Sequence, residues 1–179
     1  METATQISKS LLSMSLTGSF ISYGAGQIIS GIFGDRFSPK KLILYGLLGT
    51  SLINVLIPFC QNHVQMLVLW SINGFAQAFM WPPIVKLMTT LLSEDDYKKT
   101  VSKVIWGSSV GTIVVYVISP FLIWMSGWRA VFIFSALCSI VMSVIWNKYA
   151  YDVEVQPVKP VVRPEKGNIR IFLTPLMIA

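Results

Sequence analysis

Charged residues are scarce in this chain of 179 residues, because Asp, Glu, Lys and Arg together make up 12% of it. Soluble globular domains carry about 25% charged residues. Hydrophobic residues make up 54% of the chain, and the mean hydropathy is +0.65. This composition excludes a disordered or collagen-like chain and argues against an ordinary soluble domain. We therefore expect a polytopic membrane protein.

Cysteine and histidine are scarce as well. Cys60 and Cys138 lie far apart in apolar runs, and His63, the single histidine, lies in a short polar break. This pattern supports neither a disulfide framework nor a metal site. The sequence also shows no nucleophile–base pair and no phosphate-binding loop. It therefore predicts a protein that is not an enzyme and that uses no metal or cofactor.

Long apolar runs follow one another from residue 11 to residue 148. Each run is long enough to cross about 30 Å of hydrocarbon at 1.5 Å per residue, with some tilt. They predict an all-α membrane fold with five transmembrane helices. The runs cover residues 11–33, 42–59, 66–92, 104–125 and 130–147.

The net charge of +6 is concentrated in alternate breaks between these runs. Lys and Arg collect in segments 34–41, 93–103 and 148–170, whereas the other breaks and the start of the chain keep only Lys9 and Arg129. By the positive-inside rule, the three basic segments are predicted to be cytoplasmic. The basic excess is thus a topology signal, and no nucleic-acid partner is expected.

Small residues recur every four positions along the first run, at Gly18, Ser22, Gly26, Ser30 and Gly34. Such a ladder lets another helix approach closely. Because a strict period of four drifts around a straight helix, a single partner helix is not expected to cover all five positions.

Polar side chains inside hydrocarbon are costly, so those that are kept usually face protein or a cavity. Tyr23 and Gln27 lie beside the ladder, where they could bind a polar solute or bond to neighbouring helices. Asn73, Gln77 and Trp81 share one face of the third run. They predict a wall of a solute cavity, although a packed kink without a ligand is the alternative.

Two further features of the runs bear on the site. Pro82 and Pro83 remove two backbone donors and should bend the third run. Ser108 shares a face with Thr112 and Ser119 in the fourth run, but such hydroxyls often bond to their own backbone. The runs contain no Asp, Glu or His, which argues against proton coupling through this part of the chain.

The stretch Gly31-Ile-Phe-Gly34-Asp35-Arg36-Phe-Ser-Pro39-Lys40-Lys41 resembles motif A of the major facilitator superfamily, which joins helices 2 and 3 of that fold. The turn Ser-Gly127-Trp128-Arg129 is similar to the turn into helix 6. The resemblance implies a gating role for Gly31, Asp35, Arg36, Lys40 and Lys41. It also implies that Lys86 pairs with Asp35 and latches the cytoplasmic side.

Two stretches narrow the resemblance to the organophosphate:phosphate antiporters. Residues 22–40 resemble their helix 2, and Asn73-Gly-Phe-Ala-Gln77-Ala-Phe-Met-Trp81-Pro82-Pro83 resembles their helix 4. The glycerol-3-phosphate carrier has a Lys where Gln27 stands and a His where Ser108 falls. Its two phosphate-binding arginines belong to helices 1 and 7. A phosphorylated solute is therefore implied by the family rather than by residues of this chain.

The resemblance also implies an organisation for the whole chain. Residues 1–10 become the remnant of an external loop, and residues 11–148 become helices 2–6 of the N-terminal half. Residues 149–170 become the cytoplasmic linker between the halves, and residues 171–179 begin helix 7. On this interpretation the chain is a truncated piece of a carrier of the cell membrane that is monomeric when complete and has the lipid bilayer as its surroundings.

The implied function is secondary transport of a small organic anion or sugar phosphate by alternating access, with exchange for phosphate as one open form of coupling. The substrate cavity would include Tyr23, Gln27, Asn73, Gln77, Trp81 and Ser108. Three alternatives stay open: a membrane sensor of a phosphorylated sugar, a generic metabolite symporter of the same superfamily, and a fragment that cannot transport.

The predicted topology can be tested by cysteine labelling in intact cells. In a background without Cys60, a cysteine introduced at Asn62 should react with a membrane-impermeant thiol reagent, because segment 60–65 is predicted to be external. A cysteine at Pro39 should not react. The opposite labelling pattern would overturn the topology.

Overall fold

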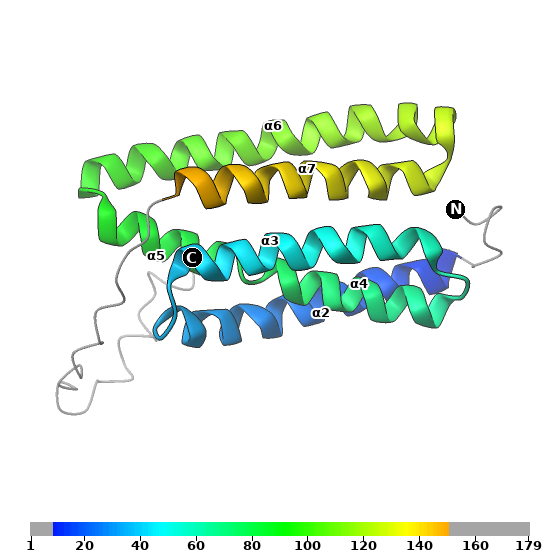
Figure 1. Cartoon of the computed structure of the whole chain (residues 1–179), viewed down its shortest axis with the longest axis horizontal. Helices are drawn as coiled ribbons and strands as arrows, with labels where there is room; N and C mark the ends of the chain where they lie inside the picture. Colours follow the sequence, from blue (N-terminus) through cyan, green and yellow to red (C-terminus); the bar gives the residue numbers. More distant parts are fainter. Residues whose placement is uncertain (1–8, 151–179) are drawn as a thin grey trace, which may run out of the picture.

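The structure of the chain is a computed structural model that describes residues 9–150, and within these residues it contains helices and no strand. Long helices run side by side along one axis (Figure 1). The elements are α2 (Lys9–Gly34), α3 (Pro39–Leu56), the 3-10 turn η1 (Ile57–Phe59), α4 (His63–Gln77), α5 (Trp81–Leu91), α6 (Glu94–Ser126) and α7 (Trp128–Tyr149). The predicted all-α class is confirmed. Most of the predicted external loop and linker, and all of the predicted final helix, lie outside the described residues.

Short polar caps start three of the helices. Ser38, Asn62 and Ser93 each accept a hydrogen bond from the backbone N–H three residues later, at 3.4, 2.9 and 3.3 Å. Such caps satisfy donors that have no partner inside the helix. The connection between α6 and α7 is a single residue, Gly127. Its φ of 78° is open to glycine but strained for a residue with a side chain.

The third apolar run forms two helices rather than one. Pro82 and Pro83 have no N–H, so the carbonyls of Ala78 and Phe79 lose their usual donors four residues on. The backbone from Ala78 to Met80 bonds instead to carbonyls three residues back, at 3.2 Å. The predicted bend is thus an interruption at residues 78–80, directly before the two prolines.

The fourth apolar run starts at residue 104, but helix α6 already begins at Glu94, so most of the basic segment 93–103 is helical. Ser93 caps it, and Glu94, Asp95 and Asp96 occupy its first turn, where negative charge is favourable. Lys98 adds an ion pair to Glu94 at 2.8 Å. The resulting helix of 33 residues is about 50 Å long, so it exceeds the hydrocarbon thickness.

Three helices are long and apolar enough to cross a membrane: α3 continued through η1, α6 and α7. Helix α2 has the length, with 26 residues, but polar side chains such as Gln27 lower its apolar character. Helices α4 and α5 are short on their own. The five predicted membrane spans, one of which would consist of α4 followed by α5, therefore stay a prediction.

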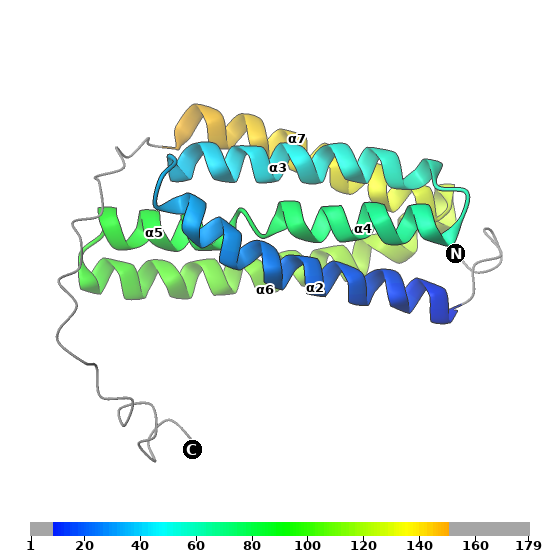
Figure 2. The ribbon, with the colours of Figure 1, turned by 90° about the horizontal axis from the view of Figure 1, so that it is seen from below.

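Helix α2 runs along α4 and α5, as Figures 1 and 2 both show. The space for a side chain at Gly18 is occupied by Ser71 and Leu67, and the space at Gly26 by Ala78. Further along, the Gly34 carbonyl accepts a hydrogen bond from α5 at 2.6 Å. The ladder is thus shared between two partners, as its drift predicts.

Helix α7 packs along α3 and is fastened to it at several levels. The Arg129 guanidinium donates to the Pro58 carbonyl at 2.8 Å, and the Trp146 indole donates to the Lys40 carbonyl at the other end at 3.1 Å. Near Pro58 a buried apolar cluster includes Cys60, and its burial raises the pKa of the thiol. Both Cys60 and Cys138 are free thiols, as expected.

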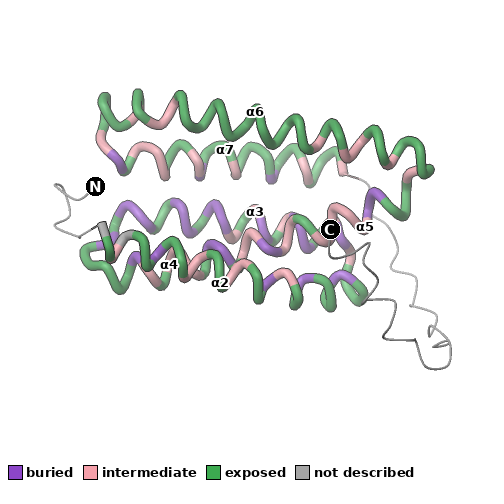
Figure 3. The backbone as a smooth tube through the Cα atoms, turned by 180° about the vertical axis from the view of Figure 1, so that it is seen from behind, coloured by how far each residue is buried: buried purple, intermediate pink, exposed green. Residues whose placement is uncertain are grey.

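Burial falls off across the bundle. Helix α3 carries many of the buried residues, whereas α6 has none (Figure 3). Helix α6 lies on α7 and has only a small contact with α5. The candidate site must therefore be sought around α2, α4 and α5, where helices pack closely and polar groups are present.

The closest helix approach predicts a stability effect at Gly74. A methyl group there would meet the backbone oxygen of Ser19, which cannot move independently of α2. Gly74→Ala should therefore lower the free energy of unfolding by about 1–3 kcal/mol. Gly24→Ala is the matched control, because nothing lies within 4 Å of its new methyl group. Tryptophan fluorescence during titration with sodium dodecyl sulfate measures both, and equal midpoints would contradict this packing.

Candidate functional site

Helix α4 has two packed sides and two open sides. Ala76 faces α3, where its carbonyl lies 3.0 Å from the position of a methyl group on Gly46, and Gly74 faces α2 at Ser19. Successive residues are about 100° apart around a helix, so the two open sides lie between these two contacts. This arrangement decides what each remaining α4 side chain can meet.

One open side of α4 is apolar. It carries side chains that are at least one-third exposed or line a groove. They are Val64, Val68, Ile72, Phe75 and Phe79. Exposed apolar side chains of this density suit contact with lipid tails.

The opposite side carries the predicted polar face and is open only in part, because Met66 and Asn73 are buried on it. Gln77 lies two residues after Phe75, which is about 200° around the helix. Gln77 is half-buried, and Trp81, 44% exposed, starts α5 directly after the interruption. Asn73 lies deeper, at 6% exposure, and its Oδ1 has no hydrogen-bond partner among the described residues. The structure therefore leaves Gln77 and Trp81 accessible and puts Asn73 inside the bundle.

Tyr23 and Gln27 bond to each other along α2. The Gln27 side-chain amide donates to the Tyr23 hydroxyl at 2.9 Å, and both side chains are half-buried. This bond within α2 is an addition to the two predicted roles, which stay predictions. The pair retains the phenol hydrogen as a donor and the amide oxygen as an acceptor.

Ser108 is exposed on α6, which packs along α7 and touches α5 (Figure 1). Its backbone carbonyl accepts a hydrogen bond from the Thr112 hydroxyl at 2.9 Å, the self-bonding pattern that makes such a face weak support for a site. The structure does not bring Ser108 into the group formed by α2, α4 and α5.

The predicted charge pair is present. Lys86 Nζ on α5 lies 3.0 Å from Asp35 Oδ1 and donates to the Gly34 carbonyl at 2.6 Å. Gly34 ends α2, where carbonyls lack intrahelical donors and positive charge is favourable. Side-chain exposure is 34% for Lys86 and 60% for Asp35, so solvent screening limits the ion pair itself to about 0–1 kcal/mol.

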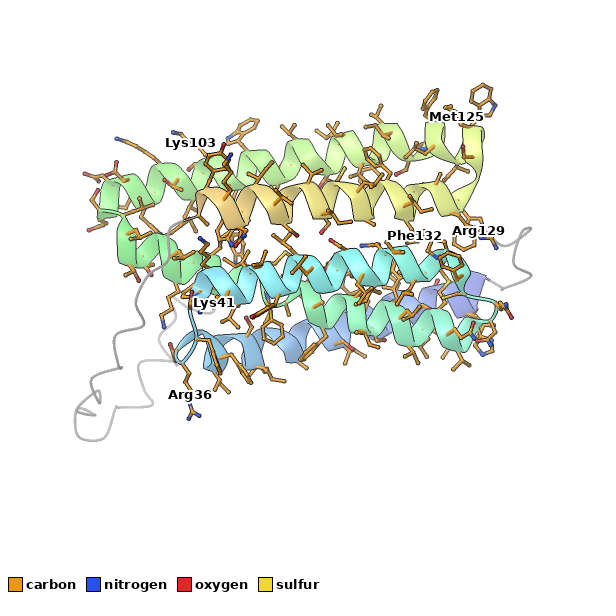
Figure 4. The ribbon with its side chains drawn as sticks, viewed as in Figure 1. Arg36, Lys41, Lys103, Met125, Arg129 and Phe132 are labelled. Atoms are coloured by element: carbon orange, nitrogen blue, oxygen red, sulfur yellow. The ribbon has the colours of Figure 1, made fainter. Side chains whose placement is uncertain are left out.

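The other motif residues lie at the same end of the bundle. Arg36 and Lys41 are exposed and Lys40 is half-buried, and none of the three forms an ion pair with a described residue. Figure 4 shows Arg36, Lys41 and Lys103 at one end and Arg129 at the other. A methyl group on Gly31 would meet nothing within 4 Å, so that glycine makes no close contact in this bundle.

Sequence reasoning missed the hydrogen bonds that fasten α7 to α3. Arg129 was expected only as part of a turn, and Trp146 was not singled out. Their carbonyl partners are 71 and 106 residues away along the chain. Backbone acceptors carry no residue-type signal, so no spacing rule could have found them. Within residues 9–150, no three Asp, Glu, His or Cys side chains gather to hold a metal ion.

Comparison with known proteins identifies the relatives of the chain. The profile described as "Major Facilitator Superfamily" matches residues 1–178. A probable hexose phosphate transport protein of Chlamydia pneumoniae is 28% identical over 132 residues, which cover 72% of this chain and 29% of that protein. The glycerol-3-phosphate transporter of Bacillus subtilis is 30% identical over 147 residues, with coverages of 77% and 32%.

A third relative has a different description. The membrane sensor protein UhpC of Escherichia coli K12 is 26% identical over 140 residues, which cover 77% of this chain and 31% of that protein. The chain thus spans about 30% of the length of the relatives it matches.

Proposed function

This chain belongs to the major facilitator superfamily, and from that premise we propose that it contributes one wall of the solute path and one part of the gate of a secondary transporter. The chain is a multi-pass membrane protein. Its proposed solute is a small organic anion, of which a sugar phosphate is the leading candidate.

The observation that carries this proposal is the two-sidedness of α4. One open side is uniformly apolar and suits lipid, whereas the other presents Gln77, with Trp81 at the following helix start. Solute sites of secondary transporters lie near the midplane at interrupted helices. The interruption at residues 78–80 lies between these two side chains.

The proposed solute class rests on the relatives, two of which are named for hexose phosphate and glycerol-3-phosphate. Phosphate groups are bound best by charged donors such as Arg. The proposed wall supplies neutral groups instead: the Gln77 amide, the Trp81 indole and the Tyr23–Gln27 pair. These groups fit the hydroxyl groups of a sugar. We therefore assign the charged donors for the phosphate group to other helices of the complete carrier.

The proposed gate is the Lys86 contact with the end of α2. It joins α5 to α2 at the basic end of the bundle, which is predicted to be cytoplasmic. Holding these ends together closes that side and favours the outward-facing state. The complete carrier is proposed to act as a monomer without catalytic chemistry.

A transport assay tests the function and separates it from the sensor alternative, which the UhpC relative favours. Proteoliposomes containing the complete protein and loaded with phosphate should take up labelled glycerol-3-phosphate or glucose-6-phosphate. Uptake that needs internal phosphate supports exchange, and uptake without it supports a symporter. Saturable binding without uptake would contradict the carrier proposal and favour the sensor alternative.

The proposed wall predicts a loss of uptake in variants at Gln77 and Trp81. Gln77→Ala in the complete carrier should lower uptake efficiency about fivefold, because a hydrogen bond between neutral groups contributes about 1 kcal/mol. Ile72→Ala, on the apolar side of α4 and 48% exposed, is the matched control. Surface expression is measured in parallel. Unchanged uptake kinetics in both Gln77→Ala and Trp81→Ala would remove this wall from the solute path.

The proposed gate predicts a shift towards the inward-facing state when either partner is neutralised. Asp35→Asn or Lys86→Gln should raise cytoplasmic labelling of a cysteine at Gln77 about fivefold, which corresponds to about 1 kcal/mol. The exchange Asp35→Lys with Lys86→Asp should restore part of the closure. Lys98→Gln breaks the exposed Lys98–Glu94 pair on α6 and is the matched control. Labelling that does not change in the two single variants would reduce the contact to an ordinary interfacial ion pair.

A further inference from the structure

A second apolar feature lies at the basic end of the bundle. A groove of about 400 Å³ opens between the end of α2, the start of α3 and the end of α4, and its lining is almost entirely apolar. Four phenylalanines form a chain of ring contacts in it, with centroids 5.3–6.3 Å apart. The lining includes Phe33, Phe37, Leu42, Tyr45, Phe75 and Phe79.

The groove opens away from the proposed solute path. Phe75 and Phe79 lie on the apolar side of α4, opposite Gln77. In Figure 2 the end of α2 approaches the start of α3, and α4 lies between the two helices. An open apolar groove on a membrane-spanning bundle meets lipid tails rather than water, so its natural occupant is an acyl chain.

Three basic residues lie next to lining residues of the same groove in the sequence. Arg36 precedes Phe37, and Lys40 and Lys41 precede Leu42. The acidic residue of this connection, Asp35, is already engaged by Lys86 at 3.0 Å. None of the three basic side chains forms an ion pair with a described residue, so the end of the groove offers positive charge to an anion.

A groove at the other end of the bundle serves as an internal comparison. It has a volume of about 440 Å³ and an apolar lining that includes Phe59, Val64 and Val68. Its lining residues have no Lys or Arg beside them in the sequence, and Arg129, the nearby cation at this end, is bound to the Pro58 carbonyl at 2.8 Å. The combination of apolar groove and basic cluster is therefore a property of one end of the bundle and not of apolar grooves in general.

We infer that the groove beside Arg36, Lys40 and Lys41 binds an anionic phospholipid of the cytoplasmic leaflet. One acyl chain lies among the aromatic rings, and the phosphate of the head group meets the basic side chains. The chemistry of both parts matches, because polybasic segments next to a membrane bind anionic lipid and aromatic side chains favour the interface. This site needs no solute transport, so it is tested independently of the proposed function.

Native mass spectrometry of the purified chain in detergent tests the charged part of the site. Dioleoyl phosphatidylglycerol should bind more tightly than dioleoyl phosphatidylcholine, which has the same acyl chains. Lys40→Gln with Lys41→Gln should weaken phosphatidylglycerol binding about 30-fold, since each lysine contributes about fivefold, while phosphatidylcholine binding is kept. The double variant Lys99→Gln with Lys103→Gln removes the same charge from α6 and should leave both affinities nearly unchanged.

A second pair of variants tests the apolar part. Phe37→Ala with Tyr45→Ala removes two exposed rings, so the bundle should still fold. This double variant should weaken the binding of both lipids to a similar extent, so that the preference for phosphatidylglycerol is kept. Trp106→Ala with Tyr116→Ala removes two exposed rings from α6 as the control.

Three outcomes would overturn the site. The first is an unchanged lipid preference after both lysines at the groove are replaced. The second is an equal loss in the α6 lysine variant, which indicates a diffuse charge effect. The third is displacement of phosphatidylglycerol by an equal concentration of inorganic phosphate, which indicates a site for a free anion.

Discussion

The close approach of α2 to α4 and α5 is the constraint on which the rest of this bundle depends. It is possible because glycine and serine recur along α2 and because Gly74 stands opposite Ser19. In a lipid environment, helices associate through packing and hydrogen bonds rather than through the hydrophobic effect, so small residues at the contact matter most. The contact ends where Lys86 meets the last carbonyl of α2.

This contact also determines the two sides of α4. With α2 against one flank and α3 against the other, the side chains of α4 that stay exposed or half-buried lie on the two sides between these contacts. The apolar side carries Ile72 and Phe75, and the polar side carries Gln77. The distinction between the apolar side and the side proposed to face the solute path thus follows from packing, because α4 contains no Asp, Glu, Lys or Arg.

Local chemistry made part of this predictable from sequence. The ladder of small residues, the bend at Pro82 and the Asp35–Lys86 pair each depend on residue type and spacing, and the structure shows all three. The roles assigned to the cavity residues stay predictions. The burial of each side chain was not predictable from spacing. Asn73 and Gln77 share a helical face, but Asn73 is buried and Gln77 is half-buried. The start of α6 was not predictable from the apolar run, because hydropathy marks only the apolar part from residue 104, whereas Ser93 caps a helix that includes the charged residues before it.

The interruption before Pro82 links the proposed wall to the proposed gate. Helix α5 is a separate element of 11 residues that begins at Trp81 and contains Lys86. Five residues of helix separate the two side chains by about 7.5 Å along the axis. A tilt of α5 that withdraws Lys86 from the end of α2 therefore also moves Trp81 relative to Gln77 on α4. The two prolines have no N–H group, so this junction has fewer helical hydrogen bonds than the rest of the helix. A bend here therefore breaks fewer backbone hydrogen bonds than a bend elsewhere. The same two prolines that interrupt the third apolar run thus place Lys86 of the proposed gate and Trp81 of the proposed wall on one short helix.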